Sequence, residues 1–159
     1  MSTSAQDRLD VINVVNLYFQ LSDAKDFSGA RALLADQLTV DFGGVNPDAE
    51  GLISADDMER SARALVGPVA LTQHVITNQV VTNNGDEATV AFYEQALHHH
   101  PDLGEDQDTN TWTLYGRGEY GLRRTPDGWK IESKRLRAVH HVGNRNLLAD
   151  VARQREPAR

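Results

Sequence analysis

Hydrophobic positions in the first part of the chain recur at helical spacing. Leu9, Ile12, Val15 and Tyr18 (or Phe19) lie three or four positions apart, which predicts a helix over residues 5–22. Further along, the pattern predicts a short helix over 27–35, a strand over 38–42, a loop over 43–51 and a helix over 54–66. This part of the chain is therefore mostly helical.

The rest of the chain alternates and is rich in Val, Ile and Thr. Four long strands are predicted, over residues 71–82, 87–99, 109–124 and 129–142. Two turn sequences, Asn83-Asn84-Gly85-Asp86 and Thr125-Pro126-Asp127-Gly128, fit tight hairpins. Trp129 and Ile131 share one face of the last strand, whereas Leu136 falls on the other. A bulge or bend near Ser133 would explain this change of face.

This order of elements predicts an α+β fold. We expect a curved, mostly antiparallel sheet with helices packed on its concave face. A sheet curled over helices leaves a cavity at its open end, which is a usual place for a ligand. We expect one domain over residues 1–145, followed by a tail over 146–159 that forms a short helix and then frays.

Composition narrows the function classes. The 159 residues include no cysteine, which excludes disulfides, thiolate nucleophiles and cysteine metal sites. The net charge of -7 disfavours nucleic-acid binding, and the basic stretch over residues 130–137 is interpreted as a solvated strand face. The sequence contains no evident signal peptide and no apolar run long enough to span a membrane. We therefore expect a cytoplasmic protein with no membrane partner.

Several short motifs resemble the SnoaL-like members of the nuclear transport factor 2-like superfamily. The resemblance spans about residues 5–145 and rests on Tyr18…Ser22-Asp23…Asp26-Phe27, Ala32–Asp36 leading to Val40-Asp41, Gln73-His74, Gly85–Ala88, Gly116-Arg117 and Arg124–Trp129. It implies a cone-shaped barrel. The most similar members are scytalone dehydratase, bile acid dehydratase and hexachlorocyclohexane dehydrochlorinase, and polyketide cyclases belong to the same family.

The resemblance implies a set of site residues. It assigns His74 as a general base and Asp23 as the carboxylate that orients it, with a second histidine at His100 or His98. Where scytalone dehydratase has a tyrosine before the aspartate this chain has Ser22, and the family's pocket asparagine falls near Glu119, which could serve as the acid that polyketide cyclases use. Expected substrate contacts are Tyr18, Phe42, Tyr115, Glu119 and Trp129.

The residues themselves support this chemistry but leave alternatives. A neutral imidazole within hydrogen-bond reach can remove a proton, and a carboxylate on its other nitrogen fixes the tautomer. Alternatively, Asp23 is a solvated helix end or a cap, and His74 is a satisfied strand histidine. Strand alternation places Glu119 with Tyr115 and Arg117, opposite a more core-like face, and Trp129 also fits a core position.

The three consecutive histidines at 98–100 do not by themselves indicate a metal site or a catalytic site. His98 and His100 fall on the face of Phe92 and Ala96, and His99 falls on the other. Two such histidines beside an acidic loop are a weak metal signal, so we expect no metal. No dinucleotide, nucleoside triphosphate or zinc-protease motif is found, and we expect no cofactor.

The favoured function is a cofactor-independent lyase, isomerase or cyclase acting on a small, hydrophobic and cyclic substrate, such as an aromatic polyketide or a steroid-like compound. One alternative is a non-catalytic domain for small-molecule binding or assembly. Another is an epoxide-hydrolase-like enzyme, for which Asp41 and Arg117 are loose candidates. The long strands favour self-association, because their convex face must be covered or polar. The family resemblance implies that the assembly is a homo-dimer or homo-trimer.

Overall fold

A computed structural model describes residues 5–43, 45 and 50–155. Its elements are α1 (Ala5–Asp23), α2 (Phe27–Ala32), β1 (Leu34–Asp41), β2 (Glu50–Ser54), α3 (Ala55–Leu65), β3 (Leu71–Asn84), β4 (Glu87–His99), a 3-10 turn (Pro101–Leu103), α4 (Gln107–Asn110), β5 (Thr111–Thr125), β6 (Gly128–Gly143) and α5 (Leu147–Gln154). The predicted α+β class is confirmed.

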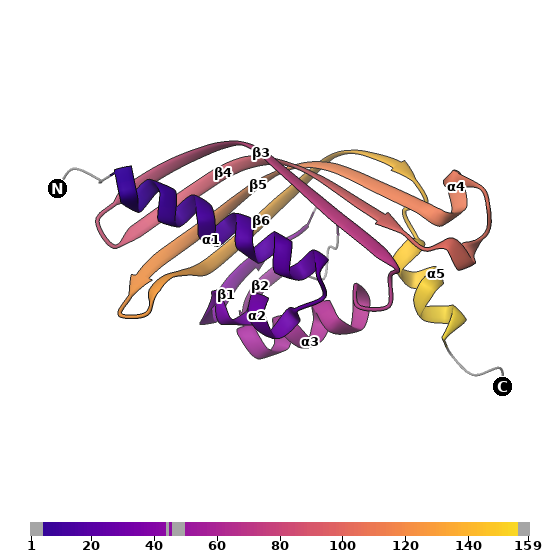
Figure 1. The fold of residues 1–159 in the computed structure, drawn as a ribbon, viewed down its shortest axis with the longest axis horizontal. Coiled ribbons are helices and arrows are strands. Elements are labelled where there is room, and N and C mark those ends of the chain that lie inside the picture. Colours follow the sequence, from indigo (N-terminus) through magenta and orange to yellow (C-terminus); the bar gives the residue numbers. More distant parts are fainter. Residues whose placement is uncertain (1–4, 44, 46–49, 156–159) are drawn as a thin grey trace.

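Six strands form one curved sheet in the order β2-β1-β6-β5-β4-β3. All neighbouring pairs are antiparallel except β1 and β6, which run parallel. Helix α1 lies along the concave face of the long strands, and α2 and α3 lie below it beside β1 and β2 (Figure 1). The hairpin between β3 and β4 turns at Gly85, whose φ of 72° suits glycine.

The main core lies between α1 and the sheet. Val11, Val15 and Phe19 of α1 pack against buried residues of the strands, including Val90, Leu122 and Ile131. Leu9, expected on the same face, is 54% exposed, because the helical turn points it away from the face that carries Val11, Val15 and Phe19. A second cluster lies at the other end of the long strands, where Leu147 and Val151 of α5 pack with Trp112 and Leu114.

Two boundaries differ from prediction near β1. The short helix ends at Ala32, and the strand begins at Leu34 instead of residue 38, because Leu34 pairs with Ile131 and is buried. The predicted loop over 43–51 runs into β2, an edge strand that pairs with β1. Residues 44 and 46–49 of that loop, and residues 156–159 of the predicted tail, lie outside the described residues.

The predicted bulge in the last strand is confirmed. Gly121 pairs with Ser133 and Leu122 pairs with Ile131, so Glu132 is the extra residue on β6. The bulge reverses the facing of the residues beyond it, and Lys134 is buried in consequence. The expectation of a solvated face for residues 130–137 is therefore wrong at Lys134.

Among the described residues, no helix is both long enough and apolar enough to cross a bilayer.

Candidate active site

Asp23 and His74 form a two-point contact. Asp23 is the last residue of α1, and His74 lies near the start of β3. The His74 ring Nδ1 lies 2.7 Å from Asp23 Oδ1, and the His74 main-chain N–H donates to Asp23 Oδ2 at 2.7 Å. A carboxylate only accepts hydrogen bonds, so the ring proton is placed on Nδ1 and the lone pair on Nε2.

The Asp23 carboxylate is further supported from the loop that follows α1. Burial would raise the pKa of Asp23, but the His74 hydrogen bonds and charge, with a hydrogen bond from Thr72, hold it below its ordinary value. Lys25 Nζ donates to Thr72 Oγ1 at 2.9 Å and to the Val66 carbonyl at 3.2 Å. Lys25 has a φ of 62°, a conformation that costs a non-glycine residue energy, so its side-chain contacts hold the loop in place.

Glu94 faces the free nitrogen of His74. Its Oε1 lies 3.8 Å from His74 Nε2, and its side chain is 5% exposed. Burial raises the pKa of Glu94, and the nearby charges of His74 and Lys134 oppose that rise. Sequence reasoning missed this residue, although strand alternation places it between the buried Phe92 and Ala96.

His98 is the second histidine of the site. Its ring lies 6.1 Å from that of His74, centre to centre, and stacks on Trp112 at 4.7 Å. Burial, with the charge of His74 and that of Lys25, lowers the pKa of His98 to about 4, so the ring is neutral at pH 7. Its Nδ1 is buried and has no hydrogen-bond partner among the described residues. Such an atom is a candidate contact for a ligand.

Lys134 closes the site from β6. Its Nζ donates to the Tyr18 hydroxyl at 2.6 Å. The ammonium also lies 4.2 Å from the Tyr18 ring centre, 5.3 Å from that of Tyr120 and 5.4 Å from that of Phe42. These rings stabilise the buried charge through their π faces. Sequence reasoning missed Lys134 because the bulge hides its facing.

A family model for the SnoaL-like domain matches residues 3–135 of the chain. The chain belongs to the SnoaL-like domain family. No curated protein matches it significantly.

Solved structures agree with that family. The Kfla4162 protein of Kribbella flavida is 30% identical, with a TM-score of 0.84, over 91% of this chain and 97% of that one. A proposed dehydratase of the NTF2-like family from Streptomyces avermitilis is 22% identical, with a TM-score of 0.71, over 86% and 99%. A type 2 hexachlorocyclohexane dehydrochlorinase is 13% identical, with a TM-score of 0.70, over 87% and 92%. The last two likenesses show the fold.

Not all expected site residues of this SnoaL-like domain lie in the interior cluster. Tyr18 and Phe42 belong to the interior cluster, because their rings contact the Lys134 ammonium. Trp129 is buried in the main core, where Arg124 stacks on its ring. His100 lies beyond the end of β4, and its Nδ1 accepts from the Ala70 main-chain N–H at 3.2 Å. The histidine that the fold brings to His74 is therefore His98.

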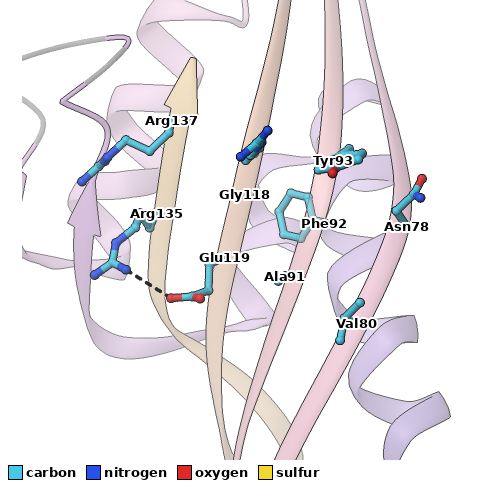
Figure 2. Close-up of a pocket in the computed structure, with 10 residues that line it drawn as sticks. Asn78, Val80, Ala91, Phe92, Tyr93, Gly118, Glu119, Arg135 and Arg137 are labelled. Atoms are coloured by element: carbon cyan, nitrogen blue, oxygen red, sulfur yellow. Dashed lines mark hydrogen bonds and ion pairs between the residues drawn. The ribbon is translucent and has the colours of Figure 1, made fainter. Parts of the chain in front are cut away.

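Tyr115 and Glu119 lie on the outer face of the sheet, away from His74, and their expected role as substrate contacts stays a prediction. Tyr115 is 39% exposed, and Glu119 forms an ion pair with Arg135 at 3.3 Å. Both alternate with buried residues of β5, and the strand has no bulge before Tyr115 that would turn them inward. Figure 2 shows Glu119 joined to Arg135 on the neighbouring strand, and both residues line an open groove of about 450 Å³ on this outer face.

The Asp41 and Arg117 pair expected for an epoxide hydrolase is not formed. Asp41 binds Arg137, whose Nη1 donates to Oδ1 at 2.7 Å, and hydrogen bonds from Arg137 lower the pKa of Asp41 to about 2. Arg117 stacks over the Tyr93 ring at 5.8 Å on the outer face. Within the described ranges, no group of three or more His, Asp or Glu side chains could hold a metal ion.

Proposed function

We propose that this SnoaL-like domain is a cofactor-independent lyase, isomerase or cyclase acting on a small, hydrophobic, cyclic substrate. The observation that carries the proposal is the two-point contact of Asp23 with His74, which leaves Nε2 as a free base. A base in this position accepts a proton from a carbon acid, and the carboxylate stabilises the imidazolium that forms. Proton removal is followed by loss of water or by ring closure.

Three features support this proposal. Structures that share this fold include a proposed dehydratase and a dehydrochlorinase, two names that denote elimination reactions. The interior concentrates groups with shifted pKa values, Glu94 and His98, as active sites commonly do. The unpartnered Nδ1 of His98 offers an acceptor for a hydroxyl group of the substrate.

Hydrogen exchange on a carbon acid tests the base without knowledge of the natural substrate. The probe is 2-tetralone, a bicyclic ketone with acidic C–H bonds, incubated with the protein in D2O and followed by NMR. We expect exchange faster than in buffer alone, and a loss of that excess of about 10²–10⁴-fold in His74→Ala, the usual contribution of a general base. Exchange that persists in a folded His74→Ala protein would overturn the assignment of the base.

The second candidate is a non-catalytic binding or assembly domain. It is favoured by one observation: neither the outer groove nor a narrow cleft of about 10 Å³ beside Tyr18 is lined by His74. The outer face also exposes Val80, Tyr93 and Val139. This candidate predicts that Asp23→Asn and His74→Ala leave ligand binding unchanged. Light scattering on the purified protein tests the homo-dimer or homo-trimer that would cover this face.

A further inference from the structure

The buried carboxyl of Glu94 faces the free nitrogen of His74, and the charge of Lys134 and the Tyr120 hydroxyl also lie near enough to interact with it. The described residues offer its oxygens no hydrogen bond, and His74 Nε2, at 3.8 Å, is the one Lys, Arg or His nitrogen among them within 4.0 Å. Its neighbours across the sheet are Ile76 on β3 and Gly116 on β5. A carboxylate in such a place would keep little solvation and no hydrogen bonds, which is costly.

The positive charge of Lys134 is satisfied without Glu94. Lys134 donates to the Tyr18 hydroxyl and lies against three aromatic rings, and no ion pair joins it to Glu94 within 4.0 Å. The other charged neighbour, Asp23, is negative and disfavours a second negative charge at Glu94. Burial, the largest effect, acts in the same direction and raises the pKa of Glu94.

We propose that Glu94 holds a proton in the resting protein and delivers it to a carbonyl oxygen of the substrate while His74 removes the proton from the neighbouring carbon. This inference rests on the proposed function and extends it. Base and acid then lie on one side of the substrate, within reach of adjacent atoms. The substrate class is a hydrophobic cyclic ketone with an acidic C–H bond and, for elimination, a hydroxyl group β to the carbonyl.

The steps balance without a cofactor. His74 Nε2 takes H⁺ from the α carbon, Glu94 gives H⁺ to the carbonyl oxygen, and an enol forms. The enol O–H then returns its proton to Glu94, the C=O bond re-forms, and the C–O bond to the β-hydroxyl breaks. The departing hydroxide takes H⁺ from the His74 imidazolium and leaves as water. Lys134 stabilises the transient Glu94 carboxylate, and Asp23 stabilises the imidazolium.

The protonation state can be measured without a substrate. In protein labelled with ¹³C at the glutamate side-chain carboxyl carbon, we expect one signal to stay in the protonated range at pH 7 and to vanish in Glu94→Gln. Glu87→Gln is the matched control, because Glu87 lies on the same strand and is exposed. Titration of the Glu94 signal together with the surface glutamates would overturn the proposal, whatever the protein does to ketones.

The catalytic role is tested by 2-tetralone exchange. We expect Glu94→Leu to lower the excess exchange rate by about 10²–10³-fold, the usual effect of removing a donor to a developing oxyanion. Glu94→Gln, which keeps a hydrogen-bond donor, should lose less. Exchange at the wild-type rate in a folded Glu94→Leu protein would contradict the role of Glu94 but leave His74 as the base. If the excess exchange is lost in His74→Ala but kept in Glu94→Leu, the proposed function stands and the proposed role of Glu94 fails.

Discussion

The two faces of the long strands differ in how their ionisable side chains are paired and solvated. On the outer face, Asp41 and Glu119 are bound by arginines, and these ion pairs are solvated. On the inner face, Glu94 and His98 are buried and have no ion-pair partner within hydrogen-bond distance. Solvated ion pairs contribute little to folding, and unpartnered buried groups oppose it. Glu94 and His98 therefore do not owe their buried positions to ion pairing, which is consistent with the chemical role proposed for this face.

Asp23→Asn should produce the largest effect on the inner face. The asparagine oxygen would accept from the His74 main-chain N–H, which turns the amide NH₂ towards Nδ1 and forces the ring proton to Nε2. We expect the excess exchange of 2-tetralone to fall by about 10²–10⁴-fold, because the wrong tautomer has no free base. Asp36→Asn, at a side chain that is 94% exposed, is the matched control. Equal rates in both variants would contradict the orienting role.

Burial of His98 should make stability depend on pH. The folded pKa is about 4, below the ordinary value of 6.5, so the unfolded chain binds a proton first as the pH falls. The stabilisation is present above pH 6.5 and is lost towards pH 4, by roughly 3 kcal/mol. Urea unfolding of His98→Phe should show a weaker pH dependence in this window, since phenylalanine keeps the stacking on Trp112. His140→Phe, at an exposed histidine, should leave the dependence unchanged.

Gly118→Ala should show how tightly the inner face is packed. A Cβ at Gly118 would overlap the Phe92 ring, which is itself buried. We expect a loss of about 1–3 kcal/mol in the free energy of unfolding, measured in urea. Arg117→Ala, the neighbouring residue on the outer face, should change it by less than about 0.5 kcal/mol. Similar losses for both variants would contradict the difference in packing.

Arg137→Ala on the outer face should have the smallest effect. The Asp41 and Arg137 pair is solvated, so its removal at pH 7 should leave the melting temperature within the scatter of surface variants. The pair stabilises the fold above the ordinary carboxyl pKa, and this contribution is lost as the pH falls towards about 2. Acid unfolding of the variant should accordingly depend less on pH below 4. A clear loss of stability at pH 7 would show that this ion pair stabilises the fold and would contradict the comparison of the two faces.

Hydrophobic periodicity predicted most of the fold because the long strands alternate regularly. It also predicted the bulge in β6, from the positions of Ile131 and Leu136. It failed for β2, a five-residue edge strand that begins beside Gly51 with a φ of 119° and is mostly exposed. Short edge strands bury few side chains, so their pattern carries little information.

The candidate site was predictable to different degrees. Asp23 and His74 came from a family resemblance, and the fold brings them into contact. Glu94 was within reach of strand alternation, which places it on the face of Phe92. Lys134 was not, because a bulge of uncertain position decides which way it faces. No local pattern distinguishes His98 from His100, since the end of β4 and not alternation separates them.

The most direct test is the tautomer of the His74 ring, measured by ¹⁵N NMR of histidine-labelled protein at neutral pH. The contact with Asp23 predicts a proton on Nδ1 and a bare Nε2, and a switch to a protonated Nε2 in Asp23→Asn. A proton on Nε2 in the wild-type protein would contradict the assignment of His74 as the base.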